Sequence, residues 1–98
     1  MASIRPYTMN GLPRLVTEAE TLKVIGHPLR LRILAILRKR ECNVKQIWEM
    51  LEIRQPILSQ HLAILREHGI VAGRRRGAAV VYSIVDPFVD RLMSLLAA

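Results

Sequence analysis

The chain is poor in residues that several protein classes require. Its 98 residues include one cysteine, Cys42, which excludes an internal disulfide and fits a reducing cytoplasm. Aromatic residues make up only 4% of the sequence, too few for the stacking platform of a single-strand-binding protein. No apolar run approaches the roughly 18 residues of a membrane span. Residues 1–14 lack the apolar stretch of a secretory signal. We therefore expect a cytoplasmic protein without membrane contact.

Acidic residues are also scarce. Eight Asp and Glu stand against 15 Lys and Arg, which gives a net charge of +7. This balance favours a polyanion such as nucleic acid as the partner, ahead of an anionic membrane surface. The hydrophobic fraction of 51% is high for so short a chain. Small domains bury little of their surface alone, so the excess indicates a subunit interface and a homodimer.

The chain divides into a short arm and one domain. Residues 1–16 contain Pro6, Gly11 and Pro13 without a steady period, and we interpret them as an N-terminal arm. Residues 17–98 form the predicted domain, whose first helix would start at Thr17 with Glu20 as its capping-box partner.

Four further helices are expected, within residues 27–41, 43–53, 55–68 and 86–98. Asn43 and Asp86 are candidate N-caps, and the spacing of Trp48 favours a core position. The last helix carries an apolar side that little else in the chain can cover. We expect this terminal helix to form a dimer contact.

The helix over residues 55–68 has two different faces. Leu58, Leu62 and Leu65 recur at helical spacing and should point inward. At about 100° per residue, Ser59 and Gln60 point outward and Gln55 lies at the edge of that face. Short polar side chains there suit the donors and acceptors of DNA base edges.

The period then changes from that of a helix to that of a strand. Residues 70–76 and 78–84 predict a β-hairpin around Gly77, with Arg74, Arg75 and Arg76 at its tip. The predicted fold is mainly α with a two-stranded β-hairpin, a winged helix-turn-helix that dimerises through its terminal helices. Such a fold would place residues 55–68 in the major groove and the arginines on phosphates or in the minor groove.

Three segments together carry a family resemblance: "GHPLRLRILAIL", "QPILSQHLAILREHGIV" and "RRRGAAVVYSI". Over about residues 20–85 the chain resembles the ArsR/SmtB family of bacterial repressors. The resemblance implies a dimeric winged helix that represses its operon and releases DNA when an inducer binds. It also implies that Gln55, Ser59 and Gln60 contact bases and that Arg74–Arg76 form the wing.

Two neighbouring residues extend the candidate DNA site. Arg54 stands where members of the family often have a capping Ser, and it could reach a phosphate or a guanine instead. His61 is included in the candidate site, although its place near the inward stripe favours a half-buried histidine over a ligand. Ser59 and His61 cannot form a catalytic pair, because residues two apart on a helix do not face each other. We expect no enzyme activity and no cofactor.

The sequence offers few residues for a site that would sense an inducer. Members of the family resemble one another in a Cys-x-Cys unit, where this chain has Asn43 and Lys45, and the last helix has Asp86 and Asp90 but no His. These donors do not predict a metal site. Cys42 resembles the first cysteine of a persulfide-sensing branch, so it is the sensor candidate, against the simpler interpretation of a small buried residue. The inducer is not indicated.

Three other functions remain open at this point. A basic winged helix could dock on an acidic protein partner, which would show no preference among duplex sequences. It could coat DNA through electrostatics alone. A thiol-redox role through Cys42 is the third, although a lone cysteine outside a C-x-x-C motif argues against turnover.

Overall fold

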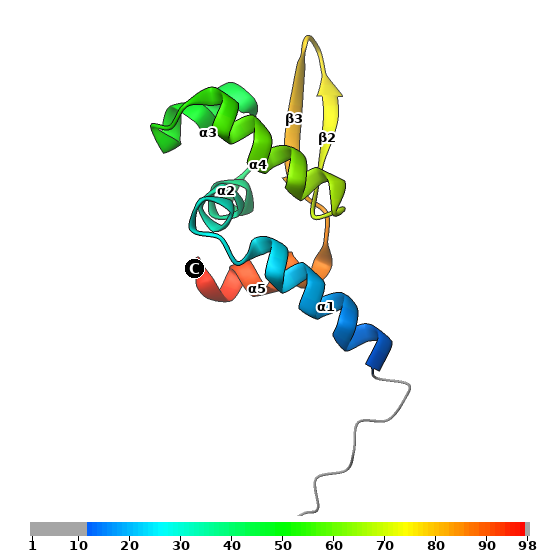
Figure 1. Ribbon diagram of the computed structural model, residues 1–98. Helices are drawn as coiled ribbons and strands as arrows, with labels where there is room; N and C mark the ends of the chain where they lie inside the picture. The colour runs from blue at the N-terminus through cyan, green and yellow to red at the C-terminus, as the bar shows by residue number, and fades with distance from the viewer. Residues whose placement is uncertain (1–11, 98) are drawn as a thin grey trace, which may run out of the picture.

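The computed structural model describes residues 12–97, which form five helices and a small antiparallel sheet (Figure 1). In chain order the elements are α1 (Leu12–Ile25), α2 (Pro28–Lys39), β1 (Cys42–Asn43), α3 (Val44–Leu51), α4 (Gln55–Glu67), β2 (Val71–Arg76), β3 (Ala79–Ile84) and α5 (Pro87–Leu96). The hairpin of β2 and β3 projects from the helices, and α1 and α5 lie at the end away from its tip (Figure 1). The predicted mainly α fold with a β-hairpin is confirmed.

Local side-chain caps fix the starts of α3 and α5. The Asn43 Oδ1 accepts a hydrogen bond from the Gln46 backbone N–H at 2.8 Å, and the Gln46 Oε1 accepts one from the Asn43 N–H at 2.9 Å. The Asp86 Oδ1 accepts from the backbone N–H groups of Phe88 and Val89 at 2.8 and 3.2 Å. Both caps follow from the sequence, because capping needs only residues two or three positions apart.

The first helix starts earlier than predicted. α1 begins at Leu12, so Thr17 lies inside it and is not its N-cap; the Thr17 carbonyl accepts a hydrogen bond from the Thr21 hydroxyl at 3.1 Å. Pro13, which suggested irregular chain, falls in the first turn, where a missing N–H breaks no helical hydrogen bond. The predicted arm therefore overlaps α1 at residues 12–16. Residues 1–11 of that arm lie outside the described residues.

The sheet has one strand more than predicted. Its order is β1-β3-β2, and β1 pairs antiparallel with β3 through Cys42 opposite Tyr82 and Asn43 opposite Val81. A strand of two residues is too short to show alternating apolar and polar residues in the sequence. The sequence therefore predicts only the two strands of the hairpin. The hairpin itself is as expected: Arg76 pairs with Ala79, and Gly77 turns the chain with a φ of +65°.

The core joins the helices to the sheet. Its buried apolar side chains are Ile25, Ile33, Leu34, Leu37, Cys42, Ile47, Leu51, Leu58, Leu62, Leu65, Ile70, Val71, Tyr82, Val89 and Met93. Trp48, which was predicted to lie in the core, is instead 39% exposed, and its indole N–H donates to the Ile53 carbonyl. On a helix as short as α3, Ile47 and Leu51 already fill the inward face, and Trp48 lies beside it.

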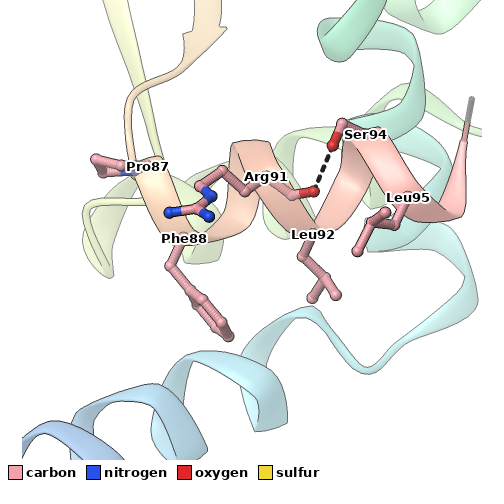
Figure 2. Close-up of a pocket in the computed structure, with 6 residues that line it drawn as sticks. All are labelled: Pro87, Phe88, Arg91, Leu92, Ser94 and Leu95. Carbon is pink, nitrogen blue, oxygen red and sulfur yellow. Dashed lines mark hydrogen bonds between the residues drawn. The ribbon is translucent and has the colours of Figure 1, made fainter.

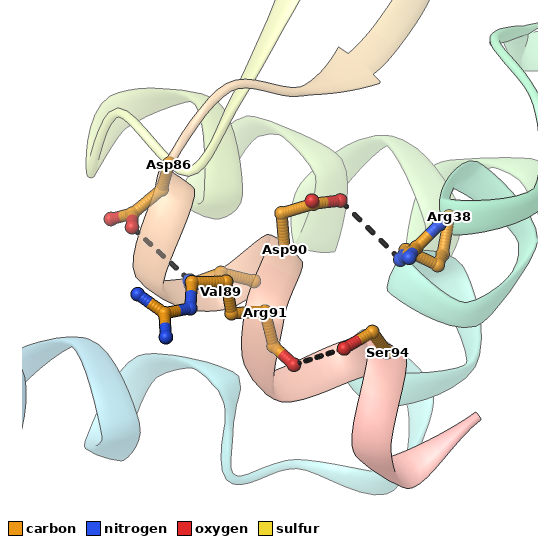
Figure 3. A network of polar contacts seen from close by, with 6 residues as sticks. All are labelled: Arg38, Asp86, Val89, Asp90, Arg91 and Ser94. Carbon is orange, nitrogen blue, oxygen red and sulfur yellow. Dashed lines mark hydrogen bonds and ion pairs between the residues drawn. The ribbon is translucent and has the colours of Figure 1, made fainter. Parts of the chain in front are cut away.

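An ion pair connects α5 to α2. The Arg38 Nε lies 3.4 Å from the Asp90 Oδ1 (Figure 3). Both side chains are partly exposed, at 39% and 51%, so solvent screens the pair and it adds little to the stability of the fold.

Candidate nucleic-acid interface

Helix α4 presents the polar face that its sequence predicts. Leu58, Leu62 and Leu65 are buried, which anchors the helix on the core. The side chains of Gln55, Ser59 and Gln60 are exposed. The structure therefore brings these three residues together on the solvent side of one rigid helix, as an interface for base edges requires.

The N-terminus of α4 is electropositive. Arg54 is the N-cap residue, and its side chain makes no capping hydrogen bond. Its carbonyl accepts from the N–H groups of Ile57 and Leu58 at 3.0 and 3.2 Å. The exposed guanidinium of Arg54 thus lies at the positive end of a helix dipole, and both attract a phosphate.

The three arginines are the last residues of strand β2, directly before the turn at Gly77 and Ala78. They pair in register with β3: Arg75 lies opposite Val80 and Arg76 opposite Ala79. All three side chains are exposed. A paired strand holds successive side chains on alternate faces, so the arginines do not share one direction.

One of the three arginines already has a partner. The Nη2 of Arg74 donates to both carboxylate oxygens of Glu41, at 2.9 and 2.7 Å. This contact attaches the hairpin to the residue that precedes β1. Glu41 was not identified from the sequence, and no local signal could have found it, because the two residues are 33 positions apart.

His61 lies on a different side of α4 from the exposed polar face. Its ring is 4.6 Å from that of His27 between centroids, and its Nδ1 accepts a hydrogen bond from the Arg30 Nε at 3.1 Å. Partial burial lowers the pKa of His61, and the neighbouring His27 and Arg30 lower it further. The structure therefore does not bring His61 together with Gln60 and its neighbours.

The remaining candidate, Cys42, is in the core. Its side chain is 0% exposed, and its Sγ lies 3.5 Å from the Arg40 carbonyl as a hydrogen-bond donor. A reagent would reach the sulfur only after local opening of the fold. Among the described residues, no three His, Cys, Asp or Glu side chains gather where they could hold a metal ion.

Comparison with known proteins identifies the family. The family described as "Bacterial regulatory protein, arsR family" matches residues 27–72. The transcriptional repressor PagR of Bacillus anthracis is 39% identical over 83 residues, which cover 84% of this chain and 83% of PagR. The chain belongs to the ArsR family. A biofilm growth-associated repressor of Agrobacterium fabrum is 39% identical over 85 residues, covering 87% of this chain and 73% of that protein.

Solved structures of ArsR-type regulators have the same fold. The crystal structure of PagR superimposes with a TM-score of 0.81 at 37% identity, covering 87% of this chain and 98% of PagR. Reduced HlyU from Vibrio cholerae gives 0.83 at 31% identity, covering 91% and 94%.

Family membership decides the broad function. This ArsR-family chain is a DNA-binding transcriptional regulator and not an enzyme. No helix within residues 12–97 combines the length and the apolar character needed to cross a membrane.

Proposed function

We propose that this ArsR-family repressor acts in the cytoplasm as a homodimer on a twofold-symmetric operator, with α4 of each protomer in the major groove. The exposed polar face of α4 is the observation that carries the proposal. Gln55 and Gln60 would pair with base edges, Ser59 would contact a base or a phosphate, and Arg54 would bind the backbone at the helix N-terminus.

The hairpin would supply the second part of the interface. Arg75 and Arg76 are exposed and would contact phosphates or enter a minor groove. Arg74 would also contact phosphates in this region, either in place of its ion pair with Glu41 or in addition to it. Because these contacts neutralise phosphates, they would add affinity for any duplex and little sequence preference.

Unpaired apolar surface supports dimerisation through the terminal helices. On α1, Val16 and Leu22 are 56% and 45% exposed; on α5, Leu95 and Leu96 are 80% and 61% exposed. Phe88, Leu92 and Leu95 project from the side of α5 that faces α1 (Figure 2). The hollow beside them is lined by Pro87, Phe88, Arg91, Leu92, Ser94 and Leu95. A second copy related by a twofold axis would bury this surface.

Release from DNA would follow binding of an inducer. The burial of Cys42 gives no support to an inducer that reacts with its thiol in the folded state. The proposal therefore places recognition on α4 and the hairpin and leaves Cys42 a place in the core.

The deciding experiment compares DNA sequences. Binding to the DNA upstream of the protein's own gene and to a random duplex of equal length would be measured at physiological salt. A preference of about 10³ or more would support a specific repressor. Equal affinity for both duplexes would favour coating of DNA, and weak binding to both would favour docking on a protein.

A further inference from the structure

Arg30 on α2 connects three helices. Its Nη1 donates to the Val24 carbonyl in the last turn of α1 at 2.8 Å, and its Nε donates to the His61 Nδ1 on α4 at 3.1 Å. The His27 ring, from the turn between α1 and α2, lies 4.6 Å from the His61 ring. We refer to Arg30, His27 and His61 as the arginine–histidine cluster. Among the described residues, the bond from Arg30 to His61 is the only side-chain hydrogen bond between α2 and α4.

We propose that Arg30 and His61 are positioning residues that hold α4 at a fixed angle to α1, and that protonation of His61 releases this hold and reduces the preference for operator DNA. The inference rests on the proposed function. It concerns a side of α4 that carries none of the proposed base contacts, so it assigns a role to residues that the DNA interface leaves unused.

The hydrogen bonds define the protonation state in which the cluster forms. The His61 Nδ1 receives the Arg30 N–H, so this nitrogen must carry a lone pair and the ring proton must lie on Nε2. The His27 Nδ1 likewise accepts the Leu29 backbone N–H at 3.1 Å. A proton on the His61 Nδ1 would point toward the Arg30 N–H and place two cations at hydrogen-bond distance.

The direction of the pH effect follows from the surroundings of His61. Partial burial lowers the pKa of His61 below its ordinary value of 6.5, and the charged or titratable groups that face it, His27 of the α1–α2 turn and Arg30 of α2, lower it further. The folded chain therefore binds fewer protons here than the unfolded chain. The contribution of His61 to stability is complete above the unfolded pKa, and it is lost as the pH falls through the folded pKa.

The angle between α1 and α4 matters because α1 belongs to the proposed dimer surface. In a dimer, this angle sets where the two α4 helices fall relative to half-sites about 34 Å apart. A helix that has lost its cluster contact would meet base edges poorly, while the arginines of the hairpin would still meet phosphates. Acid should then weaken operator binding more than binding to random DNA.

The test measures the ratio of affinities for upstream and random duplex between pH 8 and pH 5.5 at constant ionic strength. In the wild type, we expect this ratio to fall about tenfold, within the usual range of coupling between two sites. His61→Asn keeps an acceptor close to the position of Nδ1 and does not titrate, so its ratio should stay constant. His68→Asn removes an exposed histidine at the end of α4, outside the cluster, and should behave like the wild type.

A constant ratio in the wild type, or an equal fall in His61→Asn, would overturn the proposal. Arg30→Met, which removes the donor, should give the reduced ratio already at pH 8.

A second readout does not depend on DNA. ¹⁵N spectra of the His61 ring should show Nδ1 as the unprotonated acceptor at neutral pH, and acid should lower the melting temperature of the wild type more than that of His61→Asn. If the wild type shows no sequence preference at pH 8, the proposed function fails. If the ring spectrum shows a proton on Nδ1 at neutral pH, the cluster itself fails.

Discussion

At the scale of single residues, Gln60 and Arg75 are both exposed but would meet different parts of a duplex. On the proposed function, Gln60→Ala would remove a pair of hydrogen bonds to a base edge, so we expect a loss of about 1–3 kcal/mol on operator DNA and much less on random DNA. Arg75→Ala would remove a proposed phosphate contact, so both duplexes should lose affinity alike. Titrations of both variants on both duplexes measure this difference. Equal losses on the two duplexes for Gln60→Ala would contradict its role in base reading.

Gly73 is a second residue with a measurable role, in the shape of the hairpin. A Cβ at this position would lie 2.8 Å from the Val80 Cγ1 and 2.9 Å from the Tyr82 Cε1. Gly73→Ala should therefore lower the free energy of unfolding by about 1–3 kcal/mol, because a packed neighbour must move. Denaturant unfolding measures the change. The double variant with Val80→Ala should recover part of the loss; an unchanged stability of Gly73→Ala would show that the hairpin adapts freely.

The sequence predicts the roles of residues that depend on near neighbours, but not contacts between residues far apart in the chain. The caps at Asn43 and Asp86 and the outward direction of Ser59 could be read from positions within one or two helical turns. The contacts from Arg74 to Glu41 and from Arg30 to His61 join residues 33 and 31 positions apart. Contacts of that separation exist only once the chain has folded, so local periodicity carries no sign of them.

At the scale of elements, the start of α4 combines two functions that compete. Arg54 has the extended backbone of an N-cap residue, with φ −71° and ψ 135°, but its side chain makes no capping bond. Arg54→Ser should supply that bond to the N–H of Ile57, because Pro56 has none, and stabilise the fold by about 0.5–2 kcal/mol. The same change should weaken DNA binding through the loss of a cation at the helix N-terminus.

Melting temperature and duplex affinity, measured on the same preparations of Arg54→Ser, test whether stability rises while DNA binding weakens. Arg54→Lys is the matched control, because it keeps a charge and adds no cap. A more stable Arg54→Ser protein with unchanged affinity would remove Arg54 from the DNA interface.

The elements that the sequence predicted well are those in which the periodic spacing of apolar residues repeats several times. α4 and the hairpin each show several repeats of their spacing, and the structure confirms both within a residue or two. β1 consists of two residues and exists because Cys42 and Asn43 lie against β3. α1 begins five residues early because Pro13 is tolerated in a first turn, although the same residue inside a helix would break it.

At the scale of the whole molecule, an isolated protomer leaves apolar surface uncovered on α1 and α5, and the proposed dimer would bury it. Leu95 is 80% exposed on α5, so Leu95→Glu should cost the single protomer little stability. In a dimer the same charge would lie in a dry apolar contact, where an unpaired carboxylate is strongly unfavourable. We therefore expect this variant to remain folded and to become monomeric at micromolar concentration.

Sedimentation velocity and circular dichroism together measure these two outcomes. Met50→Glu is the matched control: Met50 is 49% exposed on α3, away from α1 and α5, and its replacement should leave a dimer intact. Because one protomer reaches only one half-site, the Leu95→Glu monomer should also lose most of its preference for operator DNA while its hairpin arginines still bind random duplex. A Leu95→Glu protein that stays dimeric would place the subunit contact on another face of the molecule.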